Sequence, residues 1–139
     1  MKNMKLPVTK LKKIAKKYKF NLIIIFGSYL TEQFNSNSDI DIAVQVENIK
    51  LINQHKIKIL NELASIFNHH EIDLVLLNHA DPLLKFNIAQ EGELVYEKKE
   101  GLFNIFKVRA MSEHNDAQKF YDLDKQFIEN YLQAGDNYG

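Results

Sequence analysis

Apolar residues recur along the chain with two different spacings, which predict a mixture of helices and strands. In residues 9–19 and again in residues 49–67 they return every three or four positions, the pattern of an amphipathic helix. Residues 22–26 form a short apolar run typical of a buried strand, which ends at Gly27. In residues 39–46 apolar and other side chains alternate, so this segment predicts a strand with one face in the core.

The second half of the chain begins with a further apolar segment. Residues 71–77 predict a third strand. The pair Asp81 and Pro82 predicts the start of a short helix that ends at Gly92, because aspartate caps a helix and proline fits its first turn. Residues 93–98 predict an edge strand.

The last segment, residues 102–132, has apolar side chains spaced by threes, fours and sevens, and it predicts a helix. Its middle part, residues 112–116, is entirely polar. This part either interrupts the helix or crosses solvent between two contacts. The aromatic positions are more typical of a core or a partner interface than of a ligand site: Phe103, Phe106, Phe120, Phe127 and Tyr131.

Together these elements predict an α/β (α+β) fold, a small mixed sheet flanked by helices and followed by a C-terminal helical extension. A chain of 139 residues is long enough to bury one substantial core. We expect residues 1–100 to form this domain and residues 101–139 to form the helical extension, packed on the same domain.

Composition narrows the classes of function. Eighteen basic residues balance eighteen acidic ones, so no net charge draws the whole chain to nucleic acid or to anionic membrane. The lack of cysteine excludes a disulfide framework, a thiolate nucleophile and a cysteine-based zinc site. Neither a secretory signal nor a membrane-length apolar run is seen, so we expect a cytoplasmic protein with no membrane partner. The lysines on the outer face of the first predicted helix are either simply solvated or a docking surface for an acidic partner or RNA.

Three aspartates lie where strand propensity disfavours them. Asp39 and Asp41 begin the second predicted strand, and the alternation places both side chains on one face. Two ionised carboxylates so close together repel each other unless a cation lies between them. If the third strand lies beside the second, Asp73 completes a cup of three carboxylates, an all-oxygen ligand set that suits magnesium or manganese.

Gly27 and Ser28 predict a phosphate site next to these carboxylates. Glycine at the end of a strand lets the backbone approach a ligand closely. The serine then begins a short helical turn, where backbone N–H groups and its hydroxyl favour an anion. The structural alternative is that Asp39 and Asp41 are ordinary loop-capping charges. The pair His69 and His70 is more typical of a turn than of a metal site, because adjacent side chains point in different directions.

Gly-Ser, ten residues and then Asp-Ile-Asp, with a third aspartate in a later strand, resembles the signature of the DNA polymerase beta-like nucleotidyltransferases. The small size resembles their minimal nucleotidyltransferase branch. The segment 71–97 and the helical C-terminal part resemble the MntA-like antitoxins, which pair with HEPN-domain (HepT-like) toxins. The resemblance implies a nucleotidyltransferase fold, ATP as substrate, two magnesium ions and transfer of AMP to a tyrosine hydroxyl of the toxin, which neutralises it.

The resemblance also implies roles for individual residues. Gly27 and Ser28 bind the triphosphate, and Asp39 and Asp41 bind both metal ions. Asp73 holds the catalytic ion and helps to activate the attacking hydroxyl. It further implies a hetero-oligomer with the toxin and no direct contact with nucleic acid.

One departure from the family pattern leaves other functions open. Many relatives have an arginine shortly after Gly-Ser, whereas no basic residue lies between Gly27 and Asp41 here. Lys85 is a candidate replacement only because it follows the third strand. The departure favours, slightly, a module that neutralises its toxin by binding alone. A small-molecule nucleotidyltransferase is a third hypothesis, although such enzymes usually need a sizeable helical domain.

Overall fold

The computed structural model describes residues 6–69 and 71–136, which form four helices, four strands and one 3-10 turn. In chain order these elements are α1 (Val8–Tyr18), β1 (Phe20–Phe26), η1 (Gly27–Leu30), β2 (Ile40–Val46), α2 (Ile49–Phe67), β3 (Ile72–Leu76), α3 (Pro82–Glu91), β4 (Glu93–Glu97) and α4 (Leu102–Asp136). Every helix and strand predicted from the hydrophobic spacing is present, and His70 lies outside the described residues.

The four strands form one mixed sheet in the order β3-β2-β1-β4. The central strand β1 is antiparallel to both of its neighbours, and β2 and β3 are parallel. A parallel pair needs a crossover connection, which α2 supplies. The predictions of a mixed sheet and of an edge strand near residues 93–98 are confirmed.

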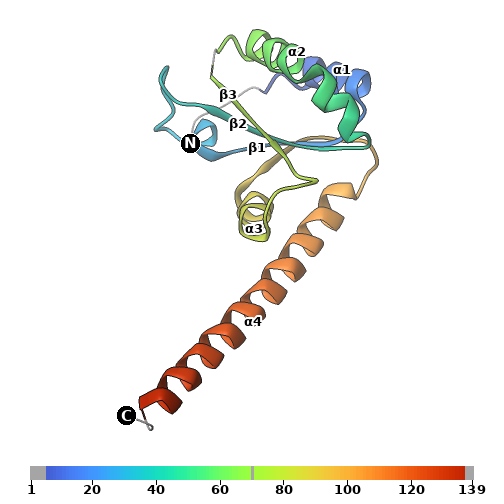
Figure 1. Cartoon of the computed structure of the whole chain (residues 1–139). Coiled ribbons are helices and arrows are strands. Elements are labelled where there is room, and N and C mark those ends of the chain that lie inside the picture. The colour runs from blue at the N-terminus through green and yellow to red at the C-terminus, as the bar shows by residue number, and fades with distance from the viewer. Residues whose placement is uncertain (1–5, 70, 137–139) are drawn as a thin grey trace.

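Helices cover both faces of the sheet (Figure 1). On one face α1 and α2 pack against Ile40, Ile42 and Val44 in the larger hydrophobic cluster. On the other face Ala43 belongs to a second cluster with Ile88 of α3 and Phe106 of α4. The alternation predicted for β2 is therefore confirmed, and it decides which side of the sheet each of its side chains faces.

Helix α3 is held at both ends as the sequence predicts. The Asp81 side chain accepts a hydrogen bond of 2.9 Å from the Leu84 amide, and Pro82 occupies the first turn. At the other end the Gly92 amide donates to the Ile88 carbonyl. A Cβ atom added to Gly92 would lie 2.5 Å from Ile24 Cγ2, so the end of α3 lies directly against β1.

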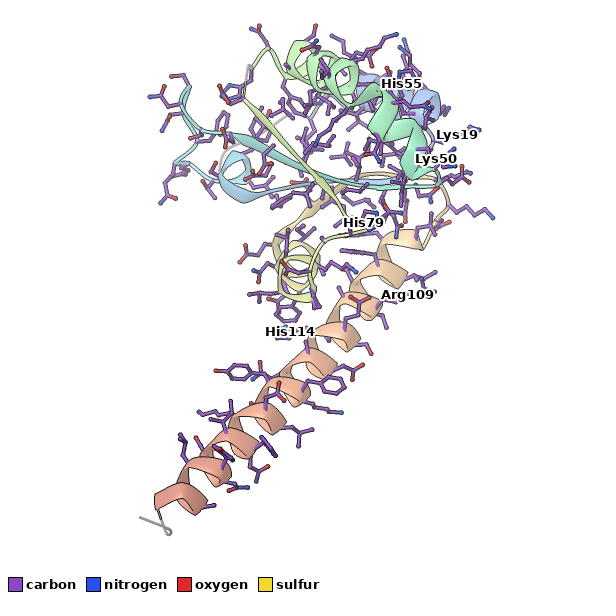
Figure 2. All side chains as sticks on the ribbon, in the orientation of Figure 1. Lys19, Lys50, His55, His79, Arg109 and His114 are labelled. Atoms are coloured by element: carbon purple, nitrogen blue, oxygen red, sulfur yellow. The ribbon has the colours of Figure 1, made fainter. Side chains whose placement is uncertain are left out.

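Helix α4 is continuous through its polar middle part, residues 112–116. Its first turns pack on the domain, where Phe106 and Ala110 are buried. Two further contacts with α3 come from the next turn. The ring of His114, which Figure 2 labels, stacks on Phe86, and Glu113 forms an ion pair of 3.0 Å with Lys85. Beyond these contacts α4 runs away from the domain (Figure 1) and its side chains are exposed up to residue 134.

No helix in the described part of the chain has both the length and the apolar character needed to cross a membrane.

Candidate active site

The structure brings two of the three aspartates face to face at one end of the sheet. Asp41 in β2 is the direct partner of Asp73 in β3 in the parallel register. Neighbouring strands lie about 4.8 Å apart, so the two carboxylates are within reach of each other. Both project from the sheet face covered by α3 and α4, because their neighbours Ile40 and Ile72 point into the cluster on the other face.

Asp39 lies just before β2, with an exposed side chain. It is two residues from Asp41, and its negative charge acts on that carboxyl group. The three aspartates selected from the sequence therefore form one acidic group at the start of β2 and β3.

The environment of Asp41 raises its pKa to about 6 from an ordinary value of 3.8. Burial is the largest cause, because it disfavours the charged form. The negative charge of Asp73, a hydrogen bond with the Asp73 carboxyl group and the charge of Asp39 act in the same direction. The neighbouring carboxylates thus favour a proton on Asp41. A cation bound there would stabilise the ionised carboxylates in the place of that proton.

Gly27 places backbone directly beside the Asp41 carboxylate. Its φ of 76° lies in the left-handed region that glycine adopts without strain. A Cβ atom at this position would lie only 2.1 Å from Asp41 Oδ2, so no other residue fits here without displacing the aspartate. The sequence predicted a close backbone approach at Gly27, but not that the near neighbour would be Asp41.

Ser28 lies in the 3-10 turn η1, and a threonine closes this turn. The Ser28 carbonyl accepts hydrogen bonds from the Thr31 amide at 2.9 Å and from Thr31 Oγ1 at 2.8 Å. The predicted helical turn after Gly27 is present, in the 3-10 form. Sequence reasoning did not find Thr31, although a threonine three residues after the serine is a common side-chain-to-backbone pairing in turns.

An aromatic cluster holds the loop between η1 and β2, and so positions Asp39. The Tyr29 ring makes edge-to-face contacts with Phe34 in the loop and with Phe67 at the end of α2. The His69 ring packs on Phe34 and its Nε2 contacts the Ser38 carbonyl. His69 therefore anchors the loop, in agreement with the expectation that it belongs to a turn. This cluster was not found from the sequence, because it joins residues 29–34 to residues 67–69, which lie more than 30 positions further along the chain.

The donor set suits a hard divalent cation, and the side chains are not yet arranged to bind one. In residues 6–69 and 71–136 no three carboxylate or imidazole groups converge closely enough to hold a metal ion as they stand. The Asp73 carboxyl group already meets that of Asp41, and the exposed side chain of Asp39 can change rotamer toward Asp41 at small cost. Carboxylate oxygens at this position fit magnesium better than zinc.

Lys85 lies elsewhere in the structure. Its ammonium group pairs with Glu113 of α4, and both residues line a cavity of about 300 Å³ together with Gln45 and Arg109. Gln45 is four residues beyond Asp41 along β2, or about 13 Å at the rise of a strand. The lysine therefore does not replace the arginine that the loop after Gly27 lacks.

The family model described as "Polymerase beta, Nucleotidyltransferase" matches residues 9–101, more than half of the chain. The chain belongs to the polymerase beta nucleotidyltransferase family. The membership of this family that the sequence implied is thereby confirmed.

Two curated relatives from this family have the same name, protein adenylyltransferase MntA. The one from Aphanizomenon flos-aquae is 31% identical over 121 residues, which span 81% of this chain and 80% of the relative. The one from Shewanella oneidensis is 32% identical over 103 residues, which span 73% of this chain and 72% of the relative. The chain is thus a homologue of the MntA adenylyltransferases over most of its length.

Solved structures with the same fold come from toxin–antitoxin complexes. A toxin–antitoxin crystal structure with AMP-PNP superposes with a TM-score of 0.69 at 27% identity, covering 91% of this chain and 99% of that one. A tri-AMPylated Shewanella oneidensis HEPN toxin in complex with its MNT antitoxin gives a TM-score of 0.63 at 26% identity, covering 91% and 96%. The nucleotidyltransferase fold implied by the sequence is confirmed.

Proposed function

We propose that this chain is the antitoxin of a HEPN/MNT pair. It transfers AMP from ATP to a tyrosine hydroxyl of its HEPN toxin in a magnesium-dependent reaction, and this modification neutralises the toxin. The observation that carries the proposal is the pairing of Asp41 with Asp73 beside the Gly27 backbone. The names of the two relatives, and a neighbouring structure with an AMPylated HEPN toxin, support the choice of substrate.

Each residue of the site has a physical role in this reaction. Two magnesium ions, when bound, would neutralise the triphosphate charge and favour the deprotonated form of the attacking hydroxyl. Asp39 and Asp41 would hold both ions, and the backbone at Gly27 and the Ser28 hydroxyl would orient the triphosphate. Asp73 would hold the ion nearer the acceptor and take up the phenolic proton. The tyrosine oxygen then bonds to the α-phosphorus, the bond to the β-phosphate oxygen breaks, and pyrophosphate leaves.

The loop after Gly27 makes this site depend strongly on its metal ions. Residues 28–38 contain no lysine, arginine or histidine, so no cationic side chain of that loop offsets the triphosphate charge. Positioning and charge neutralisation supply most of the rate enhancement in transfers to phosphorus. We therefore propose that the aspartates and their ions provide what relatives obtain partly from an arginine.

A module that neutralises the toxin by binding alone is the second candidate, and the lack of a cationic side chain in residues 28–38 is the observation in its favour. It predicts that the aspartates are dispensable for neutralisation. A small-molecule nucleotidyltransferase is less well supported, because the described chain after residue 101 is a single helix that mostly projects from the domain.

The test of the proposed function is AMP transfer to the HEPN protein encoded beside this chain. The two proteins are incubated with magnesium and α-labelled ATP, and we expect label on the HEPN protein. The variant Asp39→Ala/Asp41→Ala should lose the label by more than 100-fold, whereas Glu100→Ala, which removes an exposed carboxylate before α4, should retain it. Full neutralisation by the double variant without label would refute the proposal in favour of binding alone.

A further inference from the structure

The projecting half of α4 carries an exposed apolar stripe. We define this distal stripe as Phe120, Leu123, Phe127, Ile128 and Tyr131. The five side chains are between 56% and 72% exposed. Phe120, Leu123, Phe127 and Tyr131 recur at intervals of three and four residues, and Ile128 lies three residues before Tyr131, so all five lie on one side of the helix. An isolated exposed apolar residue is ordinary, but a continuous row of large ones marks a binding surface.

One edge of the distal stripe continues the side of α4 that packs on the domain. Ile128 lies about five helical turns beyond the buried Ala110, and Asp124 lies about five turns beyond the buried Phe106, so each pair projects in one direction. The His114 ring stacks on Phe86 of α3, and the described side chains beyond it, residues 115–134, are exposed. From His114 to residue 132 the helix extends for about 27 Å at 1.5 Å per residue. The side of α4 that packs on α3 therefore continues into the distal half of the helix. There, no other part of the described chain covers it.

The charges around the distal stripe are mainly acidic. Residues 113–132 include five carboxylates, on Glu113, Asp116, Asp122, Asp124 and Glu129, and two lysines, Lys119 and Lys125. Asp124 lies inside the stripe, between Phe120 and Ile128. Both lysines project more than a quarter turn from the centre of the stripe. Within the described residues Asp124 forms no salt bridge.

This charge pattern decides between possible occupants. A second copy packed on the distal stripe would bring a like acidic surface against Asp124, and like charges at an interface disfavour pairing. An anionic lipid surface attracts helices with a basic polar face, the opposite of what α4 offers. A helix of a different protein, apolar with a basic side chain opposite Asp124, satisfies both the packing and the charge.

We propose that the distal stripe docks an amphipathic, basic helix of the protein to which this chain transfers AMP, an inference that rests on the proposed function. The base of α4 covers the sheet face from which Asp41 and Asp73 project. A partner held along α4 therefore lies on the side of the sheet that carries the aspartates. The helix acts as an anchor that raises the local concentration of the acceptor near the site.

The test uses the full chain and its HEPN protein, with variants matched on the two sides of α4. Phe120→Ser/Phe127→Ser changes the stripe, and Gln118→Ser/Gln126→Ser changes the opposite side of the same turns. We expect the stripe variant to weaken the complex at least 100-fold and to raise the half-saturating partner concentration for AMP transfer, with the rate at saturation unchanged. The control pair should behave as the wild type.

Charge reversal tests the basic character of the partner. We expect Asp124→Lys to weaken the complex at least tenfold, and Asp122→Lys on the opposite side of the helix to leave it within about twofold. AMP-PNP binding in the absence of the partner should be equal in all variants, because none of these residues belongs to the acidic site. Circular dichroism then verifies that α4 is folded in each variant.

The other outcomes separate this inference from the proposed function. Equal partner binding by the stripe variant and the wild type overturns the inference, even if AMP transfer continues. A wild-type dimer that Phe120→Ser/Phe127→Ser dissociates overturns it in favour of a second copy. Binding to phosphatidylserine vesicles that the same variant abolishes overturns it in favour of a membrane. A stripe-dependent complex without any AMP transfer supports docking of the HEPN protein on the distal stripe and refutes the proposed function.

Discussion

At the scale of single residues, the site depends on one carboxyl group and one glycine. Asp41 is partly buried and lies near the negative charges of Asp73 and Asp39. Together these effects raise its pKa to about 6. Asp41 Oδ2 occupies the space that a side chain at position 27 would need, so the contact requires glycine there. Because these effects are local, they can be tested by single substitutions with close controls.

Replacing Gly27 by alanine should abolish AMP transfer. The added Cβ would lie 2.1 Å from Asp41 Oδ2 in a backbone of positive φ, so both the carboxylate and the turn must move. We expect at least a 100-fold loss of transfer and a destabilisation of about 1–3 kcal/mol in urea unfolding. Gly101→Ala is the matched control, since Gly101 also has a positive φ but no atom within 4 Å of an added Cβ. Equal loss of transfer in both variants would contradict the proposed contact.

Replacing Asp41 by asparagine should change how stability depends on pH. The raised pKa means that the folded state binds a proton more tightly than the unfolded state, so wild-type stability falls as pH rises from about 4 to about 6. Asp41→Asn removes this decline. After discounting for solvent screening, we expect the metal-free variant to be more stable than the wild type by about 1 kcal/mol at neutral pH.

Thermal unfolding with and without magnesium measures both effects. Magnesium should stabilise the wild type at neutral pH and leave Asp41→Asn nearly unchanged, because an uncharged amide at the centre of the acidic group binds the ion much more weakly than a carboxylate. Parallel pH profiles for the two metal-free proteins would show that the pKa of Asp41 is not raised in the folded state.

At the scale of elements, the two halves of α4 differ in how far their side chains are buried. Phe106 is 7% exposed and joins the second core cluster, whereas Phe127 is 72% exposed. The first half completes the core on the face that carries the site, and the second half is available for a partner.

Two phenylalanine-to-alanine substitutions on α4 should therefore differ sharply in cost. Phe106→Ala leaves a cavity between α4, α3 and β2, and we expect it to reduce the free energy of unfolding by about 3–5 kcal/mol. Phe127→Ala removes no packing within the chain, and we expect a change of less than about 0.5 kcal/mol. Urea unfolding measures both, and a large loss in Phe127→Ala would show that the distal half packs on the domain.

The elements were largely predictable from the sequence because their signals are local. Hydrophobic spacing gave the strands and helices, and Asp81 with Pro82 gave the start of α3. The continuity of α4 through residues 112–116 was left open. Helical hydrogen bonds are made within the backbone, and this polar part contains neither glycine nor proline, so it does not end the helix.

The relations between elements were less predictable. Asp73 could be placed beside Asp41 only on condition that β3 lies next to β2, which depends on strand order. Tyr29 packs against Phe34 and against Phe67, which is distant in sequence. No local pattern of residues predicts the contact with Phe67. The metal-binding and nucleotide-binding roles of the aspartates, Gly27 and Ser28 stay predictions.

At the scale of the whole molecule, the two faces of the sheet are used differently. One face is filled by α1 and α2 and stabilises the domain. The other face is covered by α3 and the base of α4 and carries the paired aspartates at its end, with the projecting helix on the same side (Figure 1). The nucleotide site and the proposed partner surface thus belong to one side of the molecule.

The intact mass of the HEPN protein, measured after incubation with this chain, ATP and magnesium, tests the central claim most directly. We predict a gain of one or more whole AMP units, in step with the loss of toxin activity. No gain should occur with Asp39→Ala/Asp41→Ala, although that variant still forms the complex. A neutralised HEPN protein of unchanged mass would contradict AMP transfer as the means of neutralisation.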